Sequence, residues 1–378
     1  MTADHRGGPL VGLTLGVKDI FDTADQPTEY GSPIYRGHRP RADAATVALL
    51  RAAGATVVGK TVTAEFAFFH PGPTTNPHRT THTPGGSSSG SAAAVAAGMC
   101  DVALGTQTAG SVIRPASFCG VFGFKPTFGT APVAGVKLVA PSLDTVGWFA
   151  RDPSTLEAVR AVLTGRPRAL GPLTSTRLEA NGPNPGDFWP RIALVRTEQW
   201  DTADDDSRAA VEKAAERAAN AGAAVEERDL PEKLKGLAGE QPIVQAFEGA
   251  RSLAWEWETH RHQISESLTK ILERGWGIDP DEYVRVKKRA RDARHLFSSM
   301  FGDADVLLTP AVVGEAPKGL DSTGDPRFCR LWTILGLPTL SVPGLSGHTG
   351  PPIGVQLVGR GDDDAAVIAA GGWLASVV

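Results

Sequence analysis

The chain has 378 residues, of which 41% are hydrophobic and 21% are charged, and its formal net charge is −4. These values predict a globular protein with a packed core. The small negative charge gives no basic surface for nucleic acid or an anionic membrane, so neither is an expected partner. No apolar run approaches the ~20 residues that cross a bilayer. The apolar stretch 9–17 runs straight into Lys18 without the small-residue cleavage site of a signal peptide.

Three cysteines, Cys100, Cys119 and Cys329, are widely spaced and odd in number. This pattern predicts buried, reduced thiols and a cytoplasmic location. No Cys/His spacing is typical of a zinc site, and no metal or other cofactor is expected.

Strand and helix patterns alternate along the chain. In the first third we expect, in chain order, a strand over 10–18, a helix over 43–54, a strand over 55–58, turns over 71–91, a small-residue helix over 90–98 and a strand over 102–104. Further on we expect strands at 192–195, 224–227, 305–308, 339–342 and 355–358, a helix over 204–221 and a mostly helical region over 240–302. The Pro- and Asn-rich stretch 165–190 is interpreted as a surface excursion.

Repeated alternation of this kind favours an α/β protein with helices on both faces of a sheet. We expect a single domain over residues 1–378, an α/β/α architecture around a large mixed, mostly parallel sheet. Apolar anchors in the helical region are Trp255, Trp257, Leu268, Ile271, Leu272 and Trp276. The tryptophans could line a hydrophobic substrate pocket, but tryptophan at helical spacing is more often core packing.

The segment Gly54 to Thr61 matches the pattern G-x-x-x-x-G-K-T of a phosphate-binding loop. Its context is wrong for that function, because a helix precedes it and its interior Thr56-Val57-Val58 is typical of a strand. Nucleotide binding is therefore not expected.

Two serine-containing segments carry the strongest chemical signal. Ser87 lies in a Gly- and Ser-rich turn before the small-residue helix, a pattern that is often only a flexible loop. Ser111 ends a run of small residues, Thr108 to Ser111, which leaves backbone amides accessible beside a hydroxyl. Amides aimed at charge that develops in a transition state form an oxyanion hole.

Lys18 ends the apolar run that leads through Leu15 and Val17. A lone lysine is usually solvated, but this position predicts burial, and burial favours the neutral amine that can act as a general base. Asp19 follows directly and would point to the opposite face of a strand.

Together these segments resemble the amidase signature family of serine hydrolases. The resemblance extends from Pro9 to about Leu374 and is most specific over residues 84–127. Other matching segments are 43–46, 59–61, 120–127, 144–147, 307–310, 336–338 and 354–359. The resemblance therefore explains Lys60-Thr61 as part of the family framework rather than as a phosphate loop.

The resemblance implies a catalytic triad in which Ser111 is the nucleophile, Lys18 the base and Ser87, after a cis peptide bond, the proton relay. It also implies oxyanion contacts from Thr108, Ala109, Gly110 and Ser111, with Ser88 orienting the network. It implies no metal and no cofactor.

Three departures from the commonest family pattern stand around the nucleophile. Ala109 replaces a glycine, Gln107 replaces an acidic residue, and the arginine lies three residues after Ser111, at Arg114. This form is similar to malonamidase-type amidases, in which the arginine recognises a substrate carboxylate. The alternative is that Arg114 pairs with an internal acid and only braces the loop. Only 17 residues precede Lys18, and part of the rim or subunit contact usual in the family is expected to be missing.

The expected function is hydrolysis of a small-molecule carboxamide, with a carboxylate-bearing amide as one substrate class and a homodimer left open. One alternative is the glutaminase component of a tRNA-dependent amidotransferase, which would need a partner subunit. Another is a catalytically silent binding protein, which the presence of all three triad candidates disfavours.

Overall fold

The computed structural model describes residues 7–68, 70–166 and 189–378, so most of the predicted excursion at 165–190 lies outside the described residues. One ten-stranded sheet runs through them in the order β2-β1-β3-β5-β4-β9-β10-β8-β6-β7. The strands are β1 (Thr14–Lys18), β2 (Thr56–Thr61), β3 (Val102–Gln107), β4 (Phe122–Lys125), β5 (Thr145–Ala150), β6 (Arg191–Arg196), β7 (Ala224–Asp229), β8 (Val306–Pro310), β9 (Thr339–Ser346) and β10 (Pro352–Val358). The fold is an α/β fold around a large mixed sheet, as expected.

The prediction that this sheet is mostly parallel is wrong. Both ends are parallel, through β2-β1-β3 and β8-β6-β7. The five pairings between β3 and β8 across the centre are antiparallel in the described part of the chain. Antiparallel strands can be joined by short turns, whereas parallel strands need a long crossover. The short connection between Ser346 and Pro352 makes β9 and β10 a hairpin, which the sequence patterns of single strands did not reveal.

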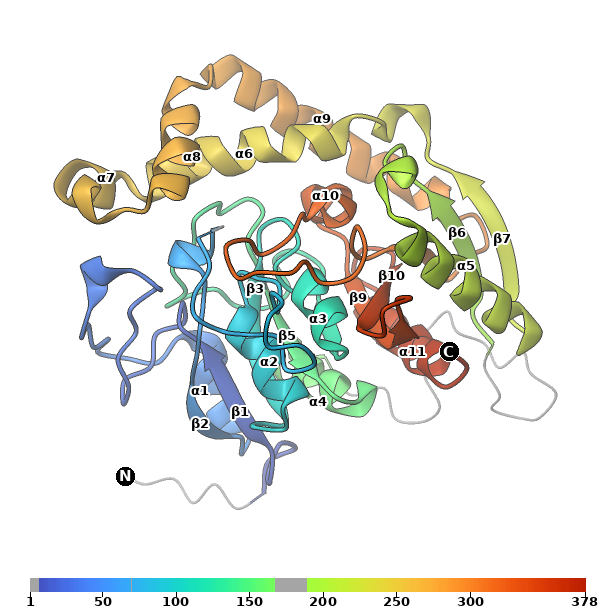
Figure 1. The fold of residues 1–378 in the computed structure, drawn as a ribbon, viewed down its shortest axis with the longest axis horizontal. Helices are drawn as coiled ribbons and strands as arrows, with labels where there is room; N and C mark the ends of the chain where they lie inside the picture. The colour runs from blue at the N-terminus through green and yellow to red at the C-terminus, as the bar shows by residue number, and fades with distance from the viewer. Residues whose placement is uncertain (1–6, 69, 167–188) are drawn as a thin grey trace.

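Helices cover both faces of the sheet (Figure 1). Their bounds are α1 (Ala45–Ala52), α2 (Ser89–Ala96), α3 (Ile113–Cys119), α4 (Pro153–Thr164), α5 (Asp205–Asn220), α6 (Leu237–Ser252), α7 (Ala254–His260), α8 (Glu266–Gly277), α9 (Pro280–Phe301), α10 (Arg327–Ile334) and α11 (Asp364–Ala375). On one face, helix α4 contacts both α1 and α11. Helices α2 and α3 pack together on the other face. None of the helices in the described ranges is long and apolar enough to cross a membrane.

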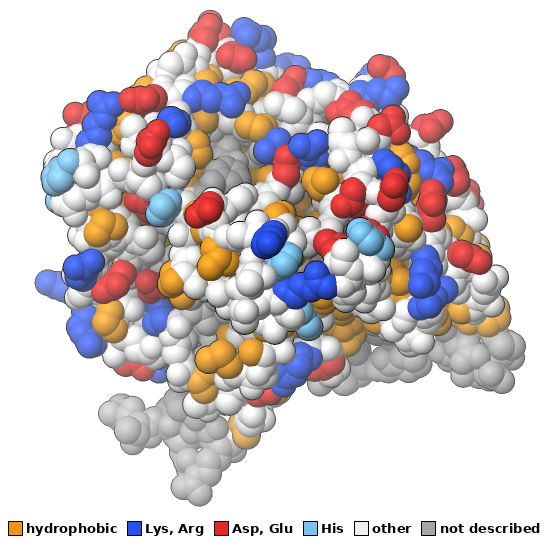
Figure 2. All heavy atoms as spheres, in the orientation of Figure 1, with side chains coloured by type: hydrophobic (Ala, Val, Ile, Leu, Met, Phe, Trp, Pro, Cys, Tyr) orange, Lys and Arg blue, Asp and Glu red, His pale blue; other side chains and the backbone are white. Residues whose placement is uncertain are grey.

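Helices α6 to α9 form a separate layer across the top of the molecule in Figure 1, and α10 lies between α6 and the sheet. On the face seen in Figure 2 the surface is hollowed between this layer and the body beneath it. Leu268 and Leu272 are buried, as expected of core anchors. Trp255 and Trp276 are 54% and 40% exposed, so they do not pack in the core.

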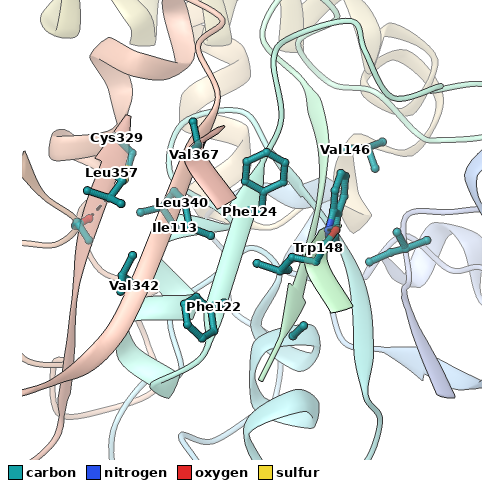
Figure 3. Packing of buried hydrophobic residues seen from close by; sticks show 14 of the residues in the cluster. Ile113, Phe122, Phe124, Val146, Trp148, Cys329, Leu340, Val342, Leu357 and Val367 are labelled. Carbon is teal, nitrogen blue, oxygen red and sulfur yellow. Dashed lines mark hydrogen bonds between the residues drawn. The ribbon is translucent and has the colours of Figure 1, made fainter. Parts of the chain in front are cut away.

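The centre of the sheet is packed with aromatic and branched side chains (Figure 3). Phe122, Phe124 and Trp148 project from β4 and β5, and Leu340 and Val342 project from β9. All are buried, and the Phe124 and Trp148 rings meet edge to face. Cys100, Cys119 and Cys329 are also buried and free of disulfides, which confirms the prediction for the thiols.

The phosphate-loop pattern is part of β2, as the sequence context indicated. Gly59, Lys60 and Thr61 have extended backbone and pair with β1. The Lys60 amine donates to the Phe21 carbonyl at 2.7 Å and lies 3.2 Å from the Asp19 carboxylate. Lys60 therefore ties β2 to the loop that follows β1.

Candidate active site

Lys18 stands at the end of β1, between β2 and β3, and its side chain is fully buried. Its Nζ is 2.9 Å from the Ser87 Oγ and 2.8 Å from the Thr106 Oγ1. Burial lowers the pKa of Lys18 to about 7, although the negative charge of Asp144 acts in the opposite direction. A large share of Lys18 is therefore neutral near neutral pH, as the apolar run of β1 predicted.

The Ser87 segment approaches Lys18 in one defined conformation. The peptide bond between Gly86 and Ser87 is cis, as the resemblance implied. The Ser87 carbonyl accepts a hydrogen bond from the Ala64 amide at 3.0 Å. The Ser88 Oγ donates to the Thr106 carbonyl at 3.2 Å and accepts from the Thr106 amide at 3.3 Å. Ser88 thus fastens this segment to β3.

Residues 107–112, here called the nucleophile loop, connect β3 to α3 and contain Ser111, which is 7% exposed. The amides of Thr108, Ala109, Gly110 and Ser111 donate to no acceptor in the part of the chain that the structure describes. Unpaired buried amides are rare in folded proteins. The loop therefore presents the free donors that an oxyanion hole requires.

Gln107 fixes the shape of the nucleophile loop. Its Oε1 accepts from the amides of Val112 and Ile113 at 2.9 and 3.0 Å, and its Nε2 donates to the Thr333 Oγ1 at 3.0 Å. The Thr333 hydroxyl in turn donates to the Ala109 carbonyl at 2.8 Å. A neutral amide thus satisfies the start of α3 at the position where the family commonly has an acid.

Arg114 joins the two serine segments. Its Nη2 donates to the Gly86 carbonyl at 2.6 Å and to the Thr323 Oγ1 at 3.1 Å. A Cβ built on Gly85 would lie 2.8 Å from the Cα of Pro115, so the backbones are in close contact. The Ser87 and Ser111 hydroxyls are not hydrogen-bonded to each other, and that of Ser111 has no partner among the described residues.

The sequence allows two roles for Arg114, recognition of a substrate carboxylate or bracing of the loop. No carboxylate lies within 4.0 Å of it in the described ranges, so pairing with an internal acid is not observed. Its Nε and Nη1 are enclosed and unpartnered, and burial lowers its pKa to about 10, which leaves it charged at neutral pH. The hydrogen bond to Gly86 favours a bracing role through the backbone.

Four further residues contact the site, and the sequence analysis did not single them out: Thr106, Asp144, Gln241 and Thr333. The Asp144 Oδ1 accepts from the Thr108 Oγ1 at 2.5 Å, and its Oδ2 accepts from the amides of Val139 and Ala140 at 2.7 and 2.9 Å. Burial raises the pKa of Asp144 to about 6, and these hydrogen bonds oppose the rise. The match to the family framework at 144–147 was the one available signal for Asp144.

The layer of helices α6 to α9 reaches the nucleophile loop through Gln241 on α6. The Gln241 Nε2 donates to the Thr108 carbonyl at 2.8 Å, and its enclosed Oε1 has no partner in the described part of the protein. The Ser265 hydroxyl, before α8, donates to the buried Glu65 carboxylate near the Ser87 segment. The same layer is thus hydrogen-bonded to the nucleophile loop and to Glu65, whose neighbour Ala64 binds the Ser87 carbonyl.

One group of side chains has the donor types of a metal site. Asp206, Glu315 and His348 place ligand atoms within 4.8 Å of one another. These carboxylates already accept hydrogen bonds from the backbone amides of His348 and Thr349. None of the three residues belongs to the segments that carry Lys18, Ser87 or Ser111, so the cluster has no place in the chemistry of that site.

Comparisons with known proteins show what the chain as a whole is similar to. The family model Amidase matches residues 1–368. The glutamyl-tRNA(Gln) amidotransferase of Anaeromyxobacter sp. (strain K) has an A subunit that is 34% identical over 407 residues, which cover 97% of this chain and 82% of that protein.

Two solved structures show the same similarity. A crystal structure of an amidase superposes with a TM-score of 0.85 at 28% identity, covering 98% of this chain and 85% of that one. Native peptide amidase from Stenotrophomonas maltophilia superposes with a TM-score of 0.77 at 29% identity, covering 98% and 83%. The chain belongs to the amidase family. It is an enzyme of the class that cleaves the C–N bond of amides.

Proposed function

We propose that this enzyme hydrolyses a small carboxamide to a carboxylate and ammonia or an amine, through an acyl-enzyme on Ser111. The observation that carries the proposal is the 2.9 Å hydrogen bond between Ser87 and the fully buried amine of Lys18. An amine whose pKa is lowered to about 7 can accept a proton near neutral pH. The three buried, free thiols fit a reducing compartment, and we propose the cytoplasm.

In the acylation step, neutral Lys18 takes a proton from Ser87 while Ser87 takes one from Ser111. The Ser111 Oγ bonds to the carbonyl carbon, and the carbonyl oxygen gains negative charge that the amides of residues 108–111 stabilise. When the C–N bond breaks, the proton returns through Ser87 to the leaving nitrogen. Water then attacks the acyl-enzyme by the same proton route, and free Ser111 is regenerated.

The triad is tested by ammonia release from a panel of aliphatic, aryl and carboxylated amides. Ser111→Ala and Lys18→Ala are expected to lower kcat by about 10³-fold or more, because loss of one member disables the whole unit. Ser87→Ala is expected to act similarly, and Ser376→Ala, which removes an exposed hydroxyl on the C-terminal helix end, should change nothing. Full activity of Ser111→Ala would rule out this mechanism.

A second candidate follows from the 34% identity to one component of a glutamyl-tRNA(Gln) amidotransferase. In that case glutamine is the amide substrate and ammonia passes to a partner. Co-purification of a second protein from the native host, together with glutamine hydrolysis that rises when that protein is added, would favour this candidate. A chain that purifies alone and hydrolyses amides at full rate would disfavour it.

A further inference from the structure

Helix α10 lies directly on the nucleophile loop. A Cβ built on Gly110 would be 2.9 Å from the Pro326 Cβ and 3.2 Å from the Cys329 Sγ. Thr333, near the other end of the helix, holds the Ala109 carbonyl. Residues three and four apart share one side of a helix. Arg330, four residues after Pro326 and three before Thr333, therefore lies on the side of α10 that faces the loop.

The surroundings of Arg330 hold more positive than negative charge. The negative charge of Asp325 raises the pKa of both Arg114 and Arg330. This carboxylate is already bound by Arg327, whose Nε and Nη2 lie 3.0 and 2.6 Å from the Asp325 Oδ2. Neither Arg114 nor Arg330 has an acid within 4.0 Å in the described ranges. Arg274 on α8 adds another positive charge near Arg330.

Arg330 makes no hydrogen bond within the described part of the chain, and its enclosed Nε has no partner. Arg330 is only partly exposed, and a guanidinium partly removed from water without an anion or an acceptor is less stable than a paired one. Burial lowers the pKa of Arg330, which is the expected sign for a cation without a close counter-charge. Without a bound ligand, the Arg330 guanidinium therefore has neither a close counter-charge nor a hydrogen-bond acceptor among the described residues.

Arg114 and Arg330 differ in how a ligand could reach them. The free Nε and Nη1 of Arg114 are both enclosed, and its Nη2 is held by Gly86 and Thr323. Arg330 is partly exposed, and its Nε alone is both enclosed and unpartnered, so its two Nη atoms remain reachable. Of the two cations beside the nucleophile loop, Arg330 is the one that can meet a ligand.

We propose that Arg330 binds a carboxylate carried by the amide substrate, and that this contact selects carboxylated amides over neutral ones of the same size. The proposal rests on the amidase function proposed above. A guanidinium presents two parallel N–H donors that match the two oxygens of a carboxylate. Arg114, on this assignment, braces the Gly86 carbonyl and does not touch the substrate.

The test compares pairs of substrates that differ only in the carboxylate. Succinamate against butyramide places the charge on the acyl side, and N-acetylglycine against N-ethylacetamide places it on the amine side. The wild type should prefer the charged member of one pair. Arg330→Gln should lower kcat/KM for that member by about 10- to 100-fold, mainly through KM, because a charged hydrogen bond is lost. The neutral member should change by less than about twofold, and Arg330→Lys should restore part of the preference.

Arg291→Gln is the matched control, because it removes one arginine charge from an exposed site on α9. It should leave both members of each pair unchanged. Equal losses for charged and neutral substrates in Arg330→Gln, or no loss for either, would overturn the proposal while leaving the amidase function intact.

A binding measurement separates this proposal from the proposed function. Succinate and N-acetylglycine are titrated calorimetrically into the wild type, Arg330→Gln and Arg330→Lys, after thermal melts have shown that each variant is folded. Weaker binding in Arg330→Gln supports the carboxylate site even if the wild type hydrolyses none of the amides, an outcome that would refute the amidase function alone. Equal binding to all three proteins overturns the carboxylate site. If Arg330→Gln does not fold, the affinities of Arg330→Lys and the wild type are compared instead. Lysine cannot make the two-point contact, so weaker binding in Arg330→Lys supports the carboxylate site and equal binding overturns it.

Discussion

Asp144 and Lys18 are two buried ionisable groups that influence each other across the nucleophile loop. The carboxylate of Asp144 raises the pKa of Lys18, and burial, the larger effect, lowers it to about 7. Asp144 also accepts a hydrogen bond from the Thr108 hydroxyl. One side chain therefore both holds the nucleophile loop and raises the pKa of Lys18, the proposed base. We therefore regard Asp144 as a positioning residue for the proposed reaction.

Asp144→Asn tests this role through the pH profile. Above its own pKa of about 6 the carboxylate is charged and stabilises protonated Lys18. Without that charge Lys18 loses its proton at lower pH, so the rising limb of kcat/KM against pH should move toward lower pH. The free energy of unfolding should also fall by about 1–3 kcal/mol, because the charge-assisted hydrogen bonds from Thr108, Val139 and Ala140 would be replaced by neutral ones.

The profile is measured from pH 5 to about 9, with Asp321→Asn as a control that removes an exposed carboxylate. A limb that stays in place, or moves toward higher pH, would show that Asp144 does not act on the base.

At the level of elements, the first turn of α2 packs backbone against backbone on the chain where β2 ends. A Cβ on Gly90 would lie 2.2 Å from the Val62 amide nitrogen, and the Gly90 amide donates to the Val62 carbonyl at 3.0 Å. Ser87 lies two residues before the first residue of this helix, so the contact also positions the proposed relay serine. Gly59 lies on the same strand but has open space where a Cβ would be.

Gly90→Ala should therefore destabilise the protein by about 3 kcal/mol or more, since neither backbone can yield without moving β2 or α2. Gly59→Ala, the matched substitution, should change the free energy of unfolding by less than about 0.5 kcal/mol. The free energy of unfolding of each variant is measured by urea denaturation at fixed pH. Equal stability of the two variants would contradict the close packing of α2.

Several strands and helices were not predicted from the sequence, and the structure gives physical reasons for this. Strands β4 and β5 are buried along their whole length, so they lack the alternation that marks a half-exposed strand. Helix α3 begins without a side-chain cap of its own, because Gln107, six residues before Ile113, supplies the acceptor. The residues next to a helix start cannot reveal a cap that is supplied from six residues earlier.

The candidate site could be predicted from the sequence only as far as its residues lie in recognisable local segments. Ser87, Ser111 and Lys18 stand in recognisable patterns, and the burial of Lys18 follows from the apolar run before it. Asp144 and Gln241 meet Thr108 from positions 36 and 133 residues away. Only the tertiary fold brings such residues together, and no spacing in the sequence encodes the contact.

At the scale of the whole molecule, the layer of helices α6 to α9 is tied to the body through buried carboxylates. Glu256 on α7 is 1% exposed. It accepts from the Tyr35 Oη at 2.7 Å and from the Lys137 Nζ at 2.5 Å. Burial raises the pKa of Tyr35, and the hydrogen bond to Glu256 adds to the rise. Glu65 holds Ser265 in the same way, so separating this layer from the body of the molecule requires these buried contacts to break.

Glu256→Gln should lower the free energy of unfolding by about 2–4 kcal/mol, because Lys137 would lose its counter-charge. It should also speed amide hydrogen exchange in residues 254–260 relative to the central strands. Glu273→Gln breaks an exposed pair with Arg261 and should change stability by less than about 0.5 kcal/mol. Unchanged exchange in Glu256→Gln would show that α7 is held by other contacts.

Lys18, Ser87 and Ser111 all come from the first 111 residues, whereas Gln241, Arg330 and Thr333 come from α6 and α10 in the second half of the chain. In the proposed mechanism, the groups that transfer protons therefore come from the first half of the chain, and the second half supplies the proposed carboxylate contact together with side chains that hold the nucleophile loop. Substitutions at Gln241 or Thr333 would disturb that loop as well as its surroundings. Arg330 makes no such contact, so it is the position at which the choice of amide could be changed while the proposed serine–lysine chemistry stays intact.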